Sequence, residues 1–259
     1  MENATKALLI AASVLIVVMI LSLIMIAYNQ ISDYYASQQE TTRVEQLSEF
    51  NKEFAGYNRS SIRGSDLISF MNKVIDYNER QAYEEGTGYE RIIVNIKVTN
   101  LNDFKYSNSD RSVIPVDDNN IISNDVNSGT SREKDKKLIS ITEIESQCTT
   151  ALANSLGIKV TNAQMQKLSA GISNIMINNN ASEIDKQKRE NLLKNIFNVN
   201  MDYNSKMSDI QKQTCNYYQY TQFKRARFDC KNIEYATGTG RINKMEFEVQ
   251  IKNGNVVFN

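Results

Sequence analysis

The residue types that most often carry chemistry in proteins are scarce in this chain of 259 residues. It has three cysteines and no histidine, so the commonest general base and the commonest metal ligand are both missing. Lys+Arg and Asp+Glu balance at 30 each, so no net charge attracts nucleic acid. The remaining routes to catalysis are a Ser–Lys pair, a pair of carboxylates or a cysteine thiolate. We predict a protein that is not an enzyme, needs no cofactor or metal, and binds no nucleic acid.

The three cysteines, Cys148, Cys215 and Cys230, lack the C-x-x-C spacing of zinc sites. They allow three pairings, of which one at most can form inside the chain. We favour a disulfide between Cys215 and Cys230, because a short loop would bring the end of a helix back to the following strand. Three buried, unpaired thiols are the alternative.

Three other patterns suggest ligand binding, and each has a simpler interpretation. Asp117, Asp118 and Asp125 lack the ligand spacing of an EF-hand. The glycines of TGTGRI at 237–242 lie between strand patterns, whereas a dinucleotide-binding loop opens a helix, so they predict a turn. The basic run KRAR at 224–227 belongs to the same region, and we interpret it as a solvated outer face.

The N-terminal region contains 22 consecutive uncharged residues, from Ala7 to Tyr28. As a helix they are about 33 Å long, enough to cross a hydrocarbon core of roughly 30 Å. The apolar run of a cleaved secretory signal is about 7–15 residues long. We therefore interpret residues 7–28 as a retained transmembrane helix in contact with the lipid bilayer, with a cleaved signal as the alternative.

Charges and aromatic residues beside this helix predict its orientation. Lys6 precedes it, and the first cation after it is Arg43. The positive-inside rule then places residues 1–6 in the cytoplasm and the body outside the plasma membrane, as a single-pass protein. Tyr28, Tyr34 and Tyr35 fit an aromatic belt at the outer interface.

Small residues in the same helix suggest close contact with other helices. Such residues let two helix backbones approach in a membrane, although alanine is also ordinary in a span. The candidates for packing against other protein subunits are Ala4, Ala7, Ala11 and Ala12.

Residues 29–56 predict a stalk helix that continues the membrane helix. No Pro or Gly occurs between Ala4 and Gly56, so nothing forces a break, although one in the polar stretch 36–43 is the alternative. Apolar residues recur at three- and four-residue steps only near its end: Val44, Leu47, Phe50 and Phe54.

The remaining residues, 57–259, predict an α+β domain. Ser65 or Asp66 caps a helix, Gly86 and Gly88 end that region, and residues 92–99 alternate as a half-buried strand. Residues 101–136 read as a long polar, mobile loop, in which Ile114, Val116, Ile121 and Ile122 form a short strand or pin the loop down.

A helical insert is predicted at 138–218. Gly157 ends one helix, Thr161 and Gln164 form a capping box for the next, and Ser182 caps a third. The apolar face of the second helix reads Met165, Leu168, Ile172, Ile175 and Met176.

The C-terminal residues 221–258 predict a β-hairpin with a trailing strand. Met245, Phe247, Val249 and Ile251 share one face. In the first arm of the hairpin, the apolar residues switch from one set of alternate positions to the other, so we expect a bulge near Lys231 and Asn232. We place Gly238 and Gly240 in the turn. The predicted fold is a transmembrane helix, a stalk, and an antiparallel sheet with an inserted helical segment.

This architecture resembles that of type IV pilins and pseudopilins, which have a long apolar N-terminal helix followed by an antiparallel sheet. Pilins carry a glycine before their cleavage point and a glutamate inside the apolar run. Here Glu2 is the only acid near the helix and no glycine precedes it, so processing and glutamate-guided assembly are not implied.

The chain also resembles uncharacterised single-pass membrane-anchored proteins of low-GC Gram-positive bacteria. The similar blocks are MENATKALLIAA, FNKEFAGY, IRGSDLISFMNKVIDYN and the final hairpin. No activity is implied by this resemblance. We expect a structural or interaction protein on the outer face, in a sharper form a pilin- or pseudopilin-like subunit. An anchored module that binds a ligand or cell-wall polymer is the alternative, and a membrane-tethered Ser–Lys peptidase the third.

Overall fold

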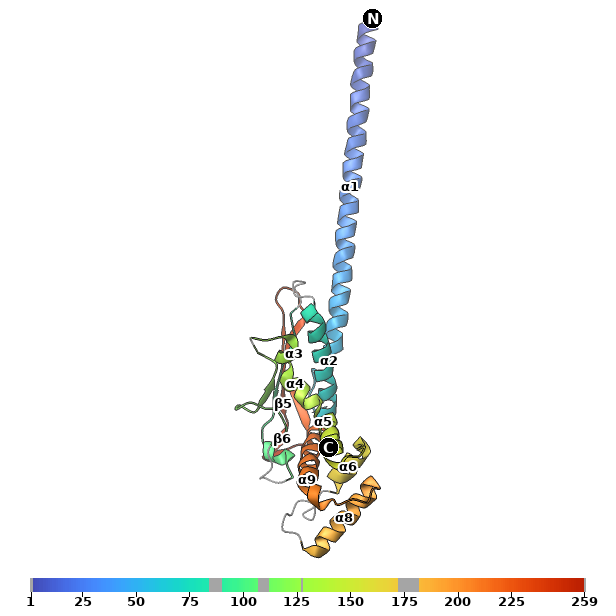
Figure 1. Cartoon of the computed structure of the whole chain (residues 1–259). Coiled ribbons are helices and arrows are strands. Elements are labelled where there is room, and N and C mark those ends of the chain that lie inside the picture. Colours follow the sequence, from blue (N-terminus) through green and yellow to red (C-terminus); the bar gives the residue numbers. More distant parts are fainter. Residues whose placement is uncertain (1, 84–89, 107–111, 127, 172–181, 259) are drawn as a thin grey trace. The chain divides into compact units, whose positions relative to one another are not determined.

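The computed structural model describes residues 2–83, 90–106, 112–126, 128–171 and 182–258 (Figure 1). It divides into two compact units, Met1–Glu53 and Phe54–Asn259. The predicted turn at Gly86 and Gly88 lies outside the described residues, as do Ile172, Ile175 and Met176. We call the second unit the body.

Helix α1 (Glu2–Ala55) is continuous over 54 residues. Residues 36–43 are helical throughout, so the break considered there does not occur. The absence of Pro and Gly accounts for this continuity, because no residue removes a backbone donor or adds backbone freedom. The membrane helix and the stalk predicted from the sequence are therefore one helix.

The body contains a five-stranded sheet with strand order β1-β4-β5-β2-β3. Its strands are β1 (Ile62–Arg63), β2 (Ile93–Lys97), β3 (Ile121–Ser123), β4 (Arg227–Tyr235) and β5 (Ile242–Val249). The fold is α+β as predicted, but the sheet is mixed, because β2 and β5 are parallel. Parallel neighbours need a long crossover, and the helical segment between β2 and β5 supplies it.

The hairpin β4–β5 contains the predicted irregularity. The register shifts between Cys230 and Asn232, so that Ile233 pairs with Met245. The arm begins at Arg227, later than the predicted 221, because the preceding helix extends to Arg225. The trailing strand forms a separate small sheet, β6 (Ile251–Lys252) with β7 (Asn255–Val256). Ile251 is consequently exposed and does not share the buried face of β5.

Helices account for most of the rest of the body. Helix α2 (Gly64–Tyr83) starts just before the predicted caps Ser65 and Asp66, which lie in its first turn. The others are α3 (Ser131–Lys134), α4 (Lys136–Thr142), α5 (Ile144–Leu156), α6 (Asn162–Ala170), α8 (Glu183–Phe197) and α9 (Met207–Arg225), with the 3-10 turns η1 (Leu101–Phe104) and η2 (Asn204–Lys206).

The helix-boundary signals read from the insert are confirmed. Gly157 ends α5 at φ +67°, Thr161 and Gln164 form the capping box of α6, and the Ser182 hydroxyl accepts from the Asp185 N–H. The loop predicted at 101–136 contains more regular structure than expected, because η1 and α3 lie within it, and the short strand considered at Ile121 and Ile122 is confirmed as β3. The Asp117 carboxylate helps to order this stretch by accepting the N–H groups of Asn119 and Ile121.

Helices α2 and α9 bury one face of the sheet. The rings of Phe70 on α2 and Phe247 on β5 are 5.2 Å apart, and those of Phe223 on α9 and Phe228 on β4 are 5.1 Å apart. The alternation predicted for β2 is confirmed, because Ile92, Val94, Ile96 and Val98 are fully buried. Asn95 and Lys97 therefore point to the opposite face.

Gly64 marks a close approach between two helices of the body. Its N–H donates to the Ala226 carbonyl at 2.8 Å, where the start of α2 meets the end of α9. A Cβ atom at residue 64 would lie 1.8 Å from the Phe223 carbonyl oxygen. Both contacts are backbone, so no rotamer change can relieve the overlap.

We expect Gly64→Ala to lower the free energy of unfolding by roughly 3 kcal/mol, because α2 and α9 have to move apart. Gly56→Ala is the matched control: its Cβ would meet no atom within 4 Å, so a change within about 1 kcal/mol is expected. Urea unfolding of the detergent-solubilised chain measures both. Equal stability of the two variants would show that the close approach is not a constraint.

Candidate functional site: the apolar segment of α1 and the polar clusters of the body

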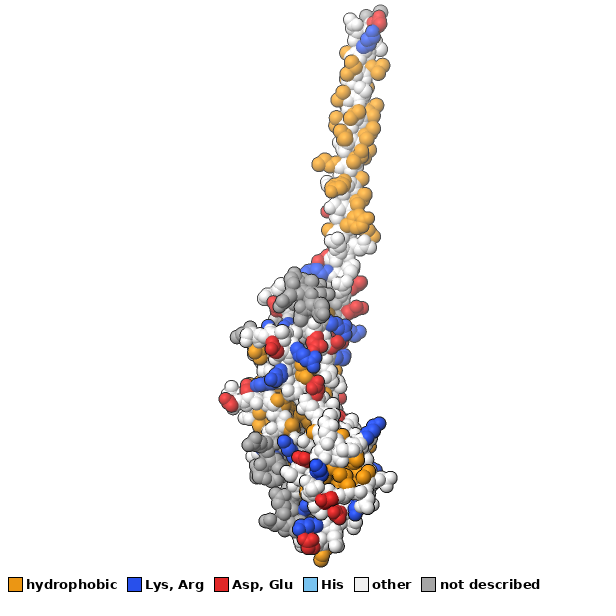
Figure 2. Space-filling model, in the orientation of Figure 1, with side chains coloured by type: hydrophobic (Ala, Val, Ile, Leu, Met, Phe, Trp, Pro, Cys, Tyr) orange, Lys and Arg blue, Asp and Glu red, His pale blue; other side chains and the backbone are white. Residues whose placement is uncertain are grey.

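The apolar part of α1 is the feature with the clearest functional meaning. Its large apolar side chains from Leu8 to Ile26 are between 51% and 74% exposed. Figure 2 shows apolar side chains covering this part of the helix on the face drawn. Among the described residues, α1 is the one helix long and apolar enough to cross a membrane, with a mean hydropathy of 3.1 in its best window.

The two hydroxyls in this segment are satisfied by the helix itself. Ser13 donates to the Ile10 carbonyl and Ser22 to the Val18 carbonyl, both at 2.8 Å. In hydrocarbon an unpaired polar group costs several kcal/mol, and only closed hydrogen-bonding patterns are stable. The segment therefore offers lipid no unpaired side-chain donor.

The predicted small residues lie on more than one side of α1. Ala4, Ala7 and Ala11 are spaced by three and four residues and share a face. Ala12 follows Ala11 directly and lies about 100° further round the helix. Three of the four candidates thus make one narrow, exposed strip.

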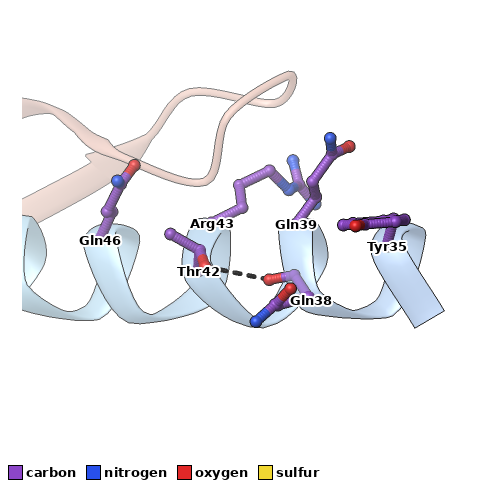
Figure 3. A pocket seen from close by; sticks show the side chains of 6 residues that line it. All are labelled: Tyr35, Gln38, Gln39, Thr42, Arg43 and Gln46. Atoms are coloured by element: carbon purple, nitrogen blue, oxygen red, sulfur yellow. Dashed lines mark hydrogen bonds between the residues drawn. The ribbon is translucent and has the colours of Figure 1, made fainter.

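The stalk part of α1 carries a shallow hollow, drawn in Figure 3. Its volume is about 310 Å³ and its lining comes from α1 alone: Tyr35, Gln38, Gln39, Thr42, Arg43 and Gln46. The Thr42 hydroxyl donates to the Gln38 carbonyl at 3.0 Å. Arg43 pairs with Glu40 one turn earlier, and this pair raises the pKa of Arg43. The hollow is uncharged except for Arg43.

The structure contains no disulfide among Cys148, Cys215 and Cys230, so the predicted Cys215–Cys230 bond is not formed. The prediction placed Cys215 near a helix end, but α9 continues to Arg225, about 15 Å further along the helix axis. Burial raises the pKa of the Cys148 thiol to about 12, so this cysteine is not a thiolate at neutral pH.

Two tyrosines and a glutamate form a polar cluster between α5 and α9. Tyr217 donates to Glu145 Oε1 at 3.1 Å, and Lys224 lies 3.8 Å from Glu145 and above the Tyr220 ring. Burial, reinforced by the Glu145 charge, raises the pKa of both phenols, that of Tyr220 to about 12. Both phenols remain protonated at neutral pH, so the cluster positions helices and supplies no activated base.

Two other sequence patterns considered for chemistry, the basic run and the glycines of TGTGRI, have structural contacts. The Arg227 side chain in the basic run donates to the Ser61 carbonyl at 2.8 Å. Gly240, at φ +71°, lies in the turn between β4 and β5, as the sequence predicts. On the outer sheet face, Lys97 pairs with Glu248 across β2 and β5 at 3.1 Å.

Asp135 forms a buried hub that the sequence analysis missed. Its Oδ1 atom accepts from Asn124 at 2.6 Å, from Arg91 at 2.8 Å and from Asn78 at 3.2 Å. Asp135 is fully buried. It lies within the run SREKDKK, whose charged composition is typical of a solvated surface. The sequence pattern therefore does not predict that Asp135 is buried.

The two asparagines of the hub extend the sheet with side-chain hydrogen bonds. Asn78 accepts from the Ile92 N–H at 2.9 Å, and Asn124 accepts from the Val94 N–H at 2.7 Å. Both amides also donate to the Ile92 carbonyl. The hub thereby joins α2, the start of β2, the end of β3 and the α3–α4 junction, and its role is structural.

Comparisons with protein-family models, curated proteins and solved structures gave no match for this chain.

Removing the Asp135 carboxylate should destabilise the body. In Asp135→Ala the buried amides and Arg91 lose their shared acceptor, and we expect a loss of about 2–4 kcal/mol. Asp135→Asn keeps an acceptor for both amides and should cost clearly less. Chemical unfolding measures the difference, with the exposed Asp125→Ala as the control; a loss no larger than the control's would rule out a hub.

The same site predicts a pH dependence. Burial, opposed by donation from Asn124, Arg91 and Asn78, raises the pKa of Asp135 above its ordinary 3.8. The folded state then holds this proton more tightly than the unfolded state, so the charge lowers stability as pH rises. We expect the stability of the parent protein relative to Asp135→Asn to fall as pH increases from about 3.8 through the raised pKa. A constant or rising difference across that window would contradict the shift.

Proposed function

We propose that this protein is a membrane-anchored structural or interaction protein. Residues 7–28 of α1 cross the plasma membrane once, the N-terminus lies in the cytoplasm, and the body acts outside the cell through contacts with other protein subunits. The observation that carries this proposal is the apolar segment of α1, in which every residue is exposed. Its length matches a hydrocarbon core and its two hydroxyls are internally bonded.

The charges on the two sides of the span support the proposed orientation. Lys6 lies before it and pairs with Glu2 at 3.1 Å, whereas Asp33 is the first charged residue after it and Arg43 the first cation. Only cations count strongly in the positive-inside rule. Tyr28, Tyr34 and Tyr35 are exposed and suit the outer interface.

A pilin- or pseudopilin-like subunit is the sharper form of the proposal. It is supported by the order of elements: one long helix, apolar first and polar later, followed by a body with a twisted sheet and a C-terminal hairpin. No glutamate lies inside the apolar run, so the proposal does not extend to glutamate-guided assembly. The polar clusters of the body are used in internal contacts, which favours a structural role.

A second candidate is an anchored binding module. A hollow of about 450 Å³ lies beside β3, and its charged lining residues are Asp117, Asp125, Glu133, Lys134, Lys136 and Lys137. This hollow would suit a charged ligand or polymer better than an apolar one, and its mixed charge gives no single ligand class.

Anchoring is tested by placing charge in the span. The parent protein should stay in the membrane pellet after alkaline carbonate extraction. In the double variant Val17→Lys, Ile20→Lys each lysine costs about 2.5–3.5 kcal/mol at the helix centre, so the protein should appear in the supernatant. The control Ala36→Lys, Ser37→Lys adds the same charge to the stalk.

The control variant should remain in the pellet. In the parent protein, protease added to intact cells should remove the body. Extraction of the parent protein by carbonate would refute the anchor. Protection of the body in intact cells, with digestion only after lysis, would refute the orientation.

A further inference from the structure

The stalk part of α1 has one face without charge, and this face follows a seven-residue repeat. Positions spaced alternately by three and four residues in α1 are Tyr28, Ile31, Tyr35, Gln38 and Thr42. We call these five residues the stalk seam. All of them are exposed. A repeat of seven residues keeps such positions aligned along a pair of supercoiled helices.

The acidic residues of this region lie away from the stalk seam. Asp33 and Glu40 follow Tyr28 and Tyr35 by five positions, which places them on the opposite side of the helix. Arg43 pairs with Glu40 within the helix at 2.9 Å. The side chains flanking the seam are also uncharged: Ala27, Ser32, Tyr34, Gln39, Thr41 and Gln46.

This arrangement favours a second copy of the chain as the partner. Residues 29–53 contain five acidic and two basic residues, so two identical stalks would repel each other if their acids met. At the stalk seam and its flanks no acid faces its counterpart, which removes the like-charge penalty between two identical helices. The next two positions of the seven-residue repeat are Glu45 and Glu49. Two identical stalks can therefore pair without repulsion between acids only as far as Thr42.

The hollow on the stalk has the geometry that a second helix requires. Four of its lining residues are Tyr35, Gln38, Gln39 and Thr42, spaced i, i+3, i+4 and i+7. In coiled coils, four residues with this spacing form the hole that receives one side chain of the facing helix. Figure 3 shows these side chains projecting around the hollow from successive turns of α1.

The membrane fixes the relative placement of two copies. The same repeat continues back through Leu21, Val14 and Ala7, and through Ile24, Val17 and Ile10. Two copies anchored in one bilayer run parallel and lie at the same depth. A parallel pair in register therefore brings each seam residue opposite its own counterpart.

We propose that the stalk seam docks against the stalk seam of a second copy, as a parallel, in-register helix pair from Tyr28 to Thr42. This inference rests on the proposed membrane anchor. Gln38 and Thr42 are polar core positions, which select one register at a cost in affinity. The pair is consequently weak without the membrane, and the span supplies the local concentration.

Site-specific photocrosslinking in membranes tests the proposal on the full chain with its cysteines intact. Benzoylphenylalanine replaces Tyr35 or Gln38 on the seam, and Asp33 or Glu40 on the opposite face as matched controls. Two differently tagged copies are expressed together. We expect a crosslinked homodimer carrying both tags from the seam positions, at least fivefold stronger than from the controls.

A charged residue placed in the stalk seam provides a second test of the pairing. Gln38→Lys should reduce the crosslink from position 35 at least fivefold, whereas Glu40→Lys should leave it unchanged. Equal crosslinking from both faces would overturn the pairing. So would the absence of a homodimer from the seam positions while the protein stays in the carbonate-resistant pellet, and in both cases the proposed anchor would still stand. Extraction of the protein by carbonate would instead show that the anchor itself is wrong.

Discussion

The apolar surface of α1 has to be removed from water, and the proposed function depends on that requirement. Large aliphatic side chains cover the segment from Leu8 to Ile26 and more than half of each is exposed. Burial of apolar surface is worth about 25 cal/mol per Å², so leaving this segment in water is strongly unfavourable. A helix satisfies the second demand of a bilayer, because its backbone groups and the hydroxyls of Ser13 and Ser22 bond internally.

The body is built to be stable by its own contacts. Aromatic pairs hold α2 and α9 on the sheet, Gly64 permits their close contact, and the Asp135 hub joins α2 to the start of β2 and the end of β3. The polar groups with the most perturbed pKa values, Cys148, Tyr217 and Tyr220, are perturbed first by burial. At each of these three groups burial favours the neutral form.

Sequence patterns predicted the elements whose causes are local. The long helix, the Thr161–Gln164 capping box, the Gly157 stop and the bulge after Cys230 each depend on a few neighbouring residues. The parallel pairing of β2 with β5 and the length of α9 depend on contacts between distant segments, and these predictions failed. Asp135 was missed for the same reason: its partners Asn78, Arg91 and Asn124 meet it only in the folded body. For the candidate site, composition alone predicted the apolar span. The stalk seam could be identified only after the structure had shown that the stalk is one unbroken helix.

The chain has no tryptophan, so a single tryptophan in place of Val17 would report on the centre of the span without interference. In lipid vesicles its emission should be blue-shifted and quenched by bromine atoms deep in the acyl chains, while a tryptophan in place of Ala36 should be quenched by aqueous acrylamide. Red-shifted emission from position 17, quenched by acrylamide and not by brominated lipid, would contradict a transmembrane α1.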